Sequence, residues 1–435
     1  MREADGAELS EGAWGIGFSR TCAKGKTVLR IAILHPAFMS VGGAEILALS
    51  QAKCLQALGH DVQIVTSAVD LQRWGDDLRP FKVDLLGARD RFDALGGREL
   101  FIARRVRRLP AILSGLDVAI AHNYPMSRIL AHASSRVRKI WYCNEPYREI
   151  HLEAAHPTLA ARREAGLPPN SMAELRFHRQ RASQQWWSLN LARKFVGEGR
   201  RDLATIEKID LLCANSGYAR ELALRTYGSR PCKVLYPVVR FPADVAHRHG
   251  LNRSELRILV HTRLVPEKNV DTVLRGFAMF ASASSTRGLL DIVGEGPSRE
   301  PLEKLARELG IAPLVHFHGF VSQSELTRIY EACEVFTLLP IDEPFGMVFP
   351  EAAARGLLMV GPDHGGPWEI LDEGKLGFVA DPFSAESLSE VYRRIASMSD
   401  DEVDRKREAA DASCRARFSE STIMSQMNSV YELEG

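Results

Sequence analysis

Residues 28–34 read Val-Leu-Arg-Ile-Ala-Ile-Leu, an apolar run that ends at His35-Pro36 and leads to the glycine turn Gly42-Gly43. Such a run between turn residues is typical of a buried strand. Residues 44–58 then repeat apolar side chains at helical spacing, and residues 62–66, Val-Gln-Ile-Val-Thr, form the next apolar run. Strand, helix and strand in this order predict two parallel strands joined by a crossover helix.

The same alternation continues along the chain and predicts an α/β fold with two parallel sheets. Further strands are expected at 118–121, 139–143, 211–214, 257–262, 289–293, 315–318, 335–339 and 357–360. The pattern breaks between Tyr236-Pro237 and about residue 254, which places a domain boundary there. Parallel sheets covered on both faces are doubly wound, and they bind ligands outside the carboxyl ends of their strands. We therefore expect two Rossmann-like domains that face each other across a cleft.

Four segments follow from this pattern. Residues 1–27 lack periodicity and predict a flexible N-terminal extension. Residues 28–242 predict the N-terminal Rossmann-like domain, with a helical, basic insertion at about 150–208. Residues 243–415 predict the C-terminal Rossmann-like domain, and 416–435 a helix that packs back on the N-terminal domain.

Composition excludes several classes of protein. The chain has 435 residues, enough for two ordinary domains, and 56 Lys and Arg against 55 Asp and Glu. A net charge of +1 disfavours a nucleic-acid-binding protein. No apolar run approaches the length of a membrane span and the polar start lacks the layout of a signal peptide, so a cytoplasmic location is expected.

Cysteine and histidine usage gives little sign of a metal site. Seven scattered cysteines without a Cys-x-x-Cys pair predict reduced, mostly buried thiols. The pair His316 and His318 alternates along an expected strand, and the favoured interpretation is ordinary packing. No metal ligands are therefore predicted.

Basic residues are concentrated in the insertion, which also contains Trp186-Trp187, and in the run Arg104-Arg105-Val106-Arg107-Arg108. Two interpretations remain open. A basic, aromatic helix can lie on an anionic membrane or hold an acidic acceptor. It can equally be a solvated helix face with its tryptophans in the core.

Two carboxylates bracket a glycine turn in Asp342-Glu343-Pro344-Phe345-Gly346-Met347-Val348-Phe349-Pro350-Glu351. The segment follows an expected strand and opens a helix, whose free N–H groups suit a diphosphate or sugar hydroxyls. Glu343 and Glu351 could then contact a sugar and a ribose. The plainer interpretation is that Glu351 only complements the helix dipole.

Two more turns follow expected strands. Thr262-Arg263-Leu264-Val265-Pro266-Glu267-Lys268 contains a guanidinium and an ammonium group suited to diphosphate oxygens. Without context, Arg263 and Lys268 are more often solvated cap residues. Gly294-Glu295-Gly296-Pro297 permits close approach of a ligand to the backbone, although such turns occur in many folds.

Taken in order, these motifs resemble glycosyltransferase family 4 over roughly residues 28–435. The resemblance rests on the Glu-x7-Glu pair Glu343 and Glu351, on the Arg-x4-Lys pair Arg263 and Lys268, and on several weaker matches. Those matches are Gly42-Gly43-Ala44-Glu45, Ala214-Asn215-Ser216, Tyr236-Pro237, Gly294-Glu295-Gly296-Pro297 and Gly365-Gly366-Pro367-Trp368-Glu369.

The resemblance implies a GT-B fold, in which the C-terminal domain holds a nucleotide-sugar donor and the N-terminal domain binds the acceptor. It implies that Arg263 and Lys268 hold the diphosphate, Glu351 the ribose, and Glu343 the transferred sugar. The backbone at Phe345, Gly346, Met347 and Val348 and the turn at Gly294 would complete the donor site, with Gly42 and Gly43 closing over it. Retention of anomeric configuration without a metal ion or other cofactor is also implied, and the sequence has no Asp-x-Asp triplet.

One segment departs from the family pattern. Many members carry a histidine where this chain has Asn144-Glu145, within Cys143-Asn144-Glu145-Pro146-Tyr147-Arg148. Asn144, Glu145 and Arg148 are candidates for binding the acceptor, as is His122 at the preceding strand end, for which local packing is the alternative. None of them simply replaces an imidazole.

The resulting hypothesis is a retaining transferase that moves a hexose from a nucleoside diphosphate sugar, GDP-mannose or a UDP-sugar, to a glycan or lipid-linked saccharide. The resemblance to the mannosyltransferase branch slightly favours mannose, and the basic segments suggest peripheral contact with the inner face of a membrane. The alternatives are a nucleotide-sugar epimerase and a non-catalytic binding or scaffold protein with the same fold. A dinucleotide oxidoreductase is disfavoured because no Gly-x-Gly-x-x-Gly follows the first strand.

Overall fold

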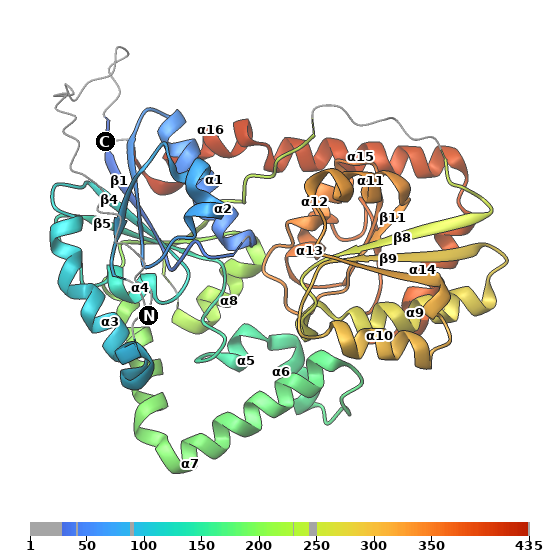
Figure 1. The fold of residues 1–435 in the computed structure, drawn as a ribbon, viewed down its shortest axis with the longest axis horizontal. Coiled ribbons are helices and arrows are strands. Elements are labelled where there is room, and N and C mark those ends of the chain that lie inside the picture. The colour runs from blue at the N-terminus through green and yellow to red at the C-terminus, as the bar shows by residue number, and fades with distance from the viewer. Residues whose placement is uncertain (1–27, 41, 88–90, 229, 243–249, 434–435) are drawn as a thin grey trace, which may run out of the picture.

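The computed structural model describes residues 28–40, 42–87, 91–228, 230–242 and 250–433, and for 91–101, 183–196 and 198 it describes only the backbone. The expected N-terminal extension with Cys22, residues 243–249 of the linker, and the side chains of Trp186 and Trp187 lie outside this description. The chain folds into two α/β domains side by side (Figure 1).

The N-terminal domain is built on a seven-stranded parallel sheet of order β3-β2-β1-β4-β5-β6-β7. Its strands are β1 (Arg30–His35), β2 (Asp61–Thr66), β3 (Lys82–Leu85), β4 (Val118–His122), β5 (Arg138–Cys143), β6 (Leu211–Ala214) and β7 (Cys232–Val234). The helices connecting them are α1 (Gly43–Ala57), α2 (Leu71–Leu78), α3 (Arg91–Ile112), α4 (Met126–Leu130) and α8 (Gly217–Tyr227).

Both faces of this sheet are buried, as a doubly wound fold requires. Alternate residues of β1 belong to different clusters: Ile31 and Ile33 pack in one, Ala32 and Leu34 in the other. Burial on both faces explains why residues 31–34, Ile-Ala-Ile-Leu, are apolar without interruption.

The C-terminal domain has a six-stranded parallel sheet of order β10-β9-β8-β11-β12-β13. Its strands are β8 (Glu255–His261), β9 (Arg287–Val293), β10 (Val315–Gly319), β11 (Val335–Thr337), β12 (Leu358–Gly361) and β13 (Phe378–Val379). Its helices are η1 (Pro266–Lys268), α9 (Val270–Ala283), α10 (Arg299–Glu308), η2 (Ala312–Leu314), α11 (Gln323–Ala332), α12 (Val348–Ala353), α13 (Gly365–Ile370), α14 (Ala385–Ser397) and α15 (Asp400–Phe418). The predicted α/β class and the two doubly wound domains are confirmed.

Two segments connect the domains besides the linker (Figure 1). Helix α16 (Glu420–Tyr431) follows α15 and packs on the N-terminal domain, where the Tyr431 hydroxyl donates to Gln51 Oε1 at 2.6 Å. The insertion contains α5 (Leu152–Ala155), α6 (Pro157–Glu164) and the 35-residue α7 (Met172–Ile206).

The insertion reaches the C-terminal domain. Its apolar residues Leu152, Leu159 and Phe177 form a cluster with Ile341 of that domain. The N-terminus of α7 is fixed there as well, because the Met172 amide donates to Asp271 Oδ2 at 2.8 Å. Within the described residues, no helix combines the length and the apolar character needed to cross a bilayer.

Candidate active site at the carboxyl ends of the strands

An ion pair joins Lys268 and Glu343, two residues 75 positions apart in the sequence. Lys268 ends η1 beyond β8, and Glu343 lies in the loop between β11 and α12. The Lys268 Nζ lies 2.6 Å from Glu343 Oε2, and about a fifth of each side chain is exposed, 23% and 18%. Burial would raise the pKa of Glu343, but Lys268 and then Arg148 outweigh it and hold the pKa below its usual value. Glu343 is therefore ionised at neutral pH.

Glu351 lies in the first turn of α12, half-buried. Burial raises its pKa, and the nearby Arg355 opposes that effect. The Arg355 guanidinium lies over the Tyr330 ring at 4.7 Å, and the Tyr330 hydroxyl lies 3.0 Å from His261 Nδ1. Glu351, the second carboxylate of the Glu-x7-Glu pair, thus lies near a cluster of aromatic and basic side chains. The spacing of the two glutamates in the sequence does not predict this cluster.

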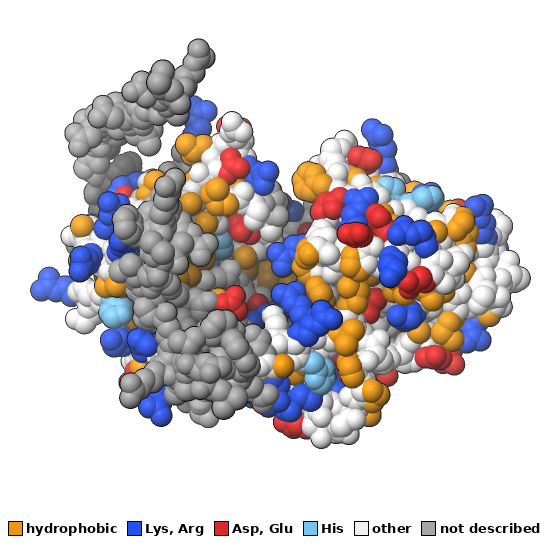
Figure 2. All heavy atoms as spheres, turned by 60° about the horizontal axis from the view of Figure 1, so that its bottom comes forward, with side chains coloured by type: hydrophobic (Ala, Val, Ile, Leu, Met, Phe, Trp, Pro, Cys, Tyr) orange, Lys and Arg blue, Asp and Glu red, His pale blue; other side chains and the backbone are white. Residues whose placement is uncertain are grey.

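The glycine turn at Gly294 brings the ends of β8 and β9 together. Thr262 and Leu264 contribute main-chain hydrogen bonds to this contact, with Thr262 N donating to Val293 O at 3.0 Å and Leu264 N to Glu295 O at 2.9 Å. Arg263 stands between them with an exposed side chain. Figure 2 shows a hollow between the two domains. On the N-terminal domain, burial raises the pKa of Glu45 on α1, and the charge of Arg263 opposes this.

The turn before α12 packs against the first residues of α13. Gly346 has a left-handed φ of +91°. The Gly366 amide donates to Glu343 O at 2.8 Å, and a Cβ on Gly366 would lie 2.4 Å from Phe345 Cα. Phe345 itself is 3% exposed and packs on Phe418, so only its backbone can face a ligand. The neighbouring Met347 and Val348 begin α12 and are half-buried.

Gly42 and Gly43 begin α1. Gly42 caps the helix in an extended conformation with φ −141°, and a Cβ there would meet Glu45 Oε2 at 2.7 Å. A Cβ on Gly43 would have no neighbour within 4 Å. The acidic side chain of Glu45 therefore folds over the first turn of its own helix.

Three asparagines follow β4, β5 and β6 of the N-terminal sheet. Asn144 Nδ2 donates to Asn123 Oδ1 at 2.7 Å, and Asn215 Nδ2 donates to Asn144 Oδ1 at 3.1 Å. Next to them, Arg148 pairs with Glu145 at 2.6 Å. Burial would lower the pKa of Arg148, but Glu145 and, from the other domain, Glu343 and Glu267 raise it.

The family models match these two halves of the chain. Residues 41–240 match the model described as Glycosyltransferase Family 4, and residues 245–412 match Glycosyl transferases group 1. The chain belongs to glycosyltransferase family 4.

Curated relatives of this family-4 chain are similar over parts of their length. It is 33% identical over 138 residues to a mannosylfructose-phosphate synthase of Agrobacterium fabrum, covering 30% of each chain. It is 29% identical over 251 residues to a D-inositol 3-phosphate glycosyltransferase of Nocardioides sp., covering 52% of this chain and 53% of that one. A GDP-mannose-dependent alpha-(1-6)-phosphatidylinositol monomannoside mannosyltransferase of Mycobacterium tuberculosis is 29% identical over 202 residues, 43% of this chain and 52% of that one. The matches thus span 30% to 53% of these relatives' lengths.

Solved structures share the fold over nearly the whole length of this protein. Anabaena HepE in complex with UDP and glucose superposes with a TM-score of 0.66 at 17% identity, covering 93% of this chain and 99% of that one. WaaG, a glycosyltransferase involved in lipopolysaccharide biosynthesis, gives a TM-score of 0.63 at 16% identity, covering 92% and 99%. These neighbours confirm the predicted GT-B fold, and the two family models confirm the predicted family.

The expected acceptor contact of His122 needs correction. Its side chain is 0% exposed and stacks on Tyr142 at 5.0 Å between ring centroids. Burial, together with His35, holds its pKa well below the usual value, so the ring is neutral. Packing, the alternative interpretation, describes this residue, because a fully buried ring cannot touch an acceptor in the cleft.

Other histidine and basic residues also have structural partners. His318 Nε2 lies 2.6 Å from the buried Asp291, and His316 Nδ1 lies 3.8 Å from it, so this pair packs on a carboxylate. Arg105 is 2% exposed and donates to Gly87 O at 3.0 Å, so the basic run of α3 is not one exposed face. The described residues contain no group of His, Cys, Asp and Glu suited to a metal ion, and the six described cysteines are free and buried.

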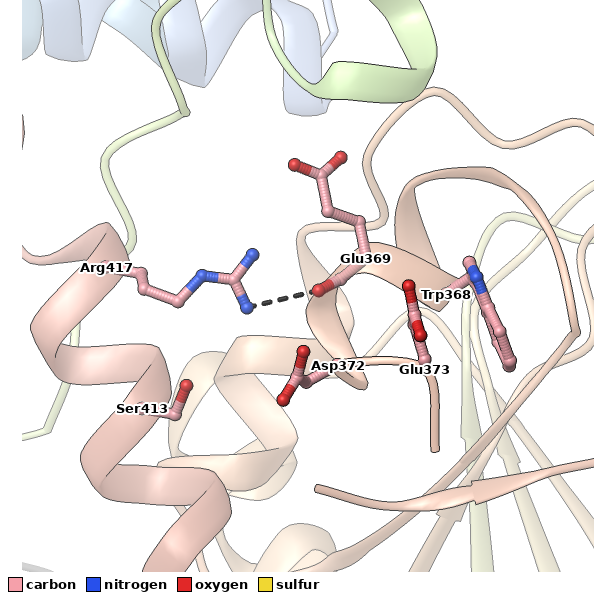
Figure 3. A pocket seen from close by; sticks show the side chains of 6 residues that line it. All are labelled: Trp368, Glu369, Asp372, Glu373, Ser413 and Arg417. Carbon is pink, nitrogen blue, oxygen red and sulfur yellow. Dashed lines mark hydrogen bonds between the residues drawn. The ribbon is translucent and has the colours of Figure 1, made fainter. Parts of the chain in front are cut away.

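A separate pocket lies between α13 and α15 (Figure 3). Its lining residues are Trp368, Glu369, Asp372, Glu373, Ser413 and Arg417. Arg417 donates to the main-chain oxygen of Glu369 at 3.1 Å, while the Glu369 carboxylate points away and accepts from Gly217 N at 2.9 Å and from the Tyr236 hydroxyl. None of Lys268, Glu343 and Glu351 lines this pocket.

Proposed function

We propose that this protein is a retaining glycosyltransferase that moves a hexose from a nucleoside diphosphate sugar to a glycan or lipid-linked saccharide, without a metal ion or other cofactor. The observation that carries the proposal is the Lys268–Glu343 ion pair at the carboxyl end of the C-terminal sheet, where doubly wound domains bind ligands. Family membership and the GT-B fold of the solved neighbours support it.

The site suits departure of a diphosphate. Lys268 and the exposed Arg263 supply positive charge to oxygens whose negative charge grows as the bond from the sugar C1 to the diphosphate oxygen breaks. The acceptor hydroxyl oxygen forms the new bond to C1 on the same face and its proton passes to the departing phosphate. The products are a glycoside and the nucleoside diphosphate. Glu343, kept ionised by Lys268, binds the sugar, and Glu351 binds the ribose.

The relatives and solved neighbours indicate which donors to test. Two of the relatives, the mannosylfructose-phosphate synthase and the GDP-mannose-dependent mannosyltransferase, have a mannosyl group in their names, which favours mannose. The HepE complex contains UDP and glucose, so UDP-sugars belong in the same test. The acceptor side is proposed to use Asn144, Glu145 and Arg148, next to Asn215, whose Oδ1 is buried and unpartnered.

Peripheral contact with the cytoplasmic face of an anionic membrane is part of the proposal. Arg107 and Arg108 of α3 are exposed and available for anionic headgroups. Liposome flotation tests this: the protein should float with vesicles that contain acidic lipid and stay behind with neutral ones. Absence from both floated fractions would exclude the membrane contact.

The donor site is tested by thermal stabilisation with GDP, UDP, GDP-mannose and UDP-glucose in the presence of EDTA. Wild type should be stabilised by one base only, and Glu351→Ala should abolish the shift. Glu373→Ala, which removes a carboxylate lining the α13–α15 pocket, is the matched control and should retain the shift. At millimolar ligand a micromolar site raises stability by about 4 kcal/mol, so absence of any shift contradicts the proposal.

Product analysis separates the alternatives. An epimerase converts the free donor to another nucleotide sugar without acceptor, whereas a transferase releases nucleoside diphosphate. A scaffold protein binds the donor and releases nothing with any acceptor mixture.

A further inference from the structure

Asp342, directly before Glu343, has an unusual backbone conformation. Its φ is +53°, in the left-handed region that residues other than glycine rarely adopt. Its side chain is 0% exposed. Such a conformation persists only where the surrounding structure fixes it. The groups that fix Asp342 therefore also determine the direction in which Glu343 leaves the loop.

Most of these groups belong to the N-terminal domain. The Tyr218 hydroxyl donates to Asp342 Oδ1 at 2.7 Å, and the Thr158 amide donates to the same oxygen at 3.3 Å. His156 Nδ1 lies 3.9 Å from Oδ2, too far for a direct hydrogen bond. From the C-terminal domain itself, His364 Nε2 accepts from the Asp342 amide at 3.2 Å.

Residues on either side of Asp342 also contact the N-terminal domain. The Ser216 hydroxyl, two residues before Tyr218, donates to the main-chain oxygen of Pro344. Ile341 lies in the apolar cluster of the insertion, and its amide donates to Glu267 O at 3.0 Å, next to Lys268. The N-terminal domain thus contacts the chain on both sides of Glu343.

We propose that Asp342 is a positioning residue through which the N-terminal domain holds the Glu343 carboxylate against Lys268. The inference rests on the proposed function, in which Glu343 binds the transferred sugar. It adds that the donor site has its working geometry only while Tyr218 and Thr158 touch Asp342. Contact between the domains then determines the rate of transfer, and not only access to the cleft.

Tyr218→Phe tests this, because it removes the donor to Asp342 and keeps the ring. Tyr227→Phe is the matched control: Tyr227 lies on the same helix, and its hydroxyl donates to the buried Asp202 Oδ2 at 3.0 Å within the N-terminal domain. With GDP-mannose or UDP-glucose, Tyr218→Phe should lower kcat for nucleoside diphosphate release by about tenfold while the donor KM changes by less than about twofold. Tyr227→Phe should leave kcat within about twofold of wild type, even where it lowers the melting temperature.

Hydrogen exchange provides a readout independent of turnover. Tyr218→Phe should accelerate exchange of the amides of residues 341–347, and Tyr227→Phe should not. Equal kcat values for the two variants, or unchanged exchange at 341–347 in Tyr218→Phe, would overturn the inference even if wild type transfers sugar. If wild type binds and turns over no donor, the proposed function fails, and the exchange result alone decides whether Asp342 is held in this way.

Discussion

A Cβ atom on Gly294 would lie 1.9 Å from the carbonyl oxygen of Thr262. The φ of Gly294 is +125°, which is unfavourable for any residue with a Cβ atom even where no neighbouring atom lies close. Both restraints act at the point where the loops after β8 and β9 meet, beside Arg263. The loop that carries Arg263 and Lys268 therefore keeps its position only with glycine at 294.

We predict that Gly294→Ala displaces this loop, costs about 2–4 kcal/mol of unfolding free energy and removes stabilisation by the donor nucleotide. Urea unfolding and a nucleotide-dependent melting assay measure the two effects. Gly75→Ala is the control, because a Cβ on Gly75 in α2 meets nothing within 4 Å. It should raise stability by about 0.5–1 kcal/mol and retain nucleotide binding. A Gly294→Ala protein of wild-type stability and affinity would refute the steric argument.

Lys268→Met should lower turnover of the donor by about 100-fold, because it removes a positive charge from the departing diphosphate. It should also change the dependence of stability on pH. The pKa of Glu343 is lowered in the folded protein, so its ionised form stabilises the fold above its unfolded pKa of about 4.3, and this contribution disappears as pH falls through the lower folded pKa.

The stability difference between wild type and Lys268→Met should therefore be largest near neutral pH and shrink below about pH 4.3. Urea unfolding from pH 7 to 3.5 measures it. Lys304→Met, which breaks an exposed pair with Glu308, should give a small difference at every pH. A difference for Lys268→Met that does not vary with pH would contradict the assigned role of the ion pair in stability.

The sequence predicts those parts of the site that depend on local pattern. The strands that bring Lys268 and Glu343 to one sheet edge are apolar runs between turn residues, and parallel order then places their carboxyl ends together. Strands β7 and β13 have three and two residues, too few to show a period, and were not predicted. Half-exposed β3, Lys82–Leu85, was also missed.

Contacts between the domains could not be predicted, because they join residues far apart in sequence. Nothing near Asp342 indicates that a Tyr218 hydroxyl 124 positions away will bind it. His122 shows the opposite case: its place at a strand end predicted exposure to the cleft, but the Tyr142 ring covers it. Burial of a side chain by a residue from another strand cannot be predicted from the sequence of its own strand.

Arg176→Gln should lower turnover severalfold with a change in stability below about 1 kcal/mol, because its pair with Glu267 is partly exposed. The Arg176 guanidinium lies 2.9 Å from Glu267 Oε2 and joins α7 to the residue before Lys268. Arg181→Gln is the control, since Arg181 lies on the same helix and pairs with Glu153 within the insertion. Equal turnover in the two variants would show that the insertion does not position Lys268.

Asp291→Asn should destabilise the C-terminal domain by about 2–3 kcal/mol, because it leaves a guanidinium without its counter-charge. Asp291 is fully buried in β9, where Arg257 Nε and His318 Nε2 each lie 2.6 Å from its carboxylate. Burial would raise the pKa of Asp291, but Arg257 and His318 outweigh it and lower the pKa. The ionised carboxylate therefore stabilises the fold above its unfolded pKa of about 3.9, and that contribution is lost as pH falls through the folded pKa.

Urea unfolding of wild type and Asp291→Asn should accordingly show a gap at neutral pH that closes below about pH 3.9. Glu255→Gln provides the comparison, because Glu255 forms a more exposed pair with Arg287 between the same two strands, at 3.5 Å. It should cost less than about 0.5 kcal/mol at any pH, since solvent screens the pair. If both variants cost the same, burial of Asp291 does not strengthen its ion pairs, and the network around β9 is no more stabilising than a surface pair.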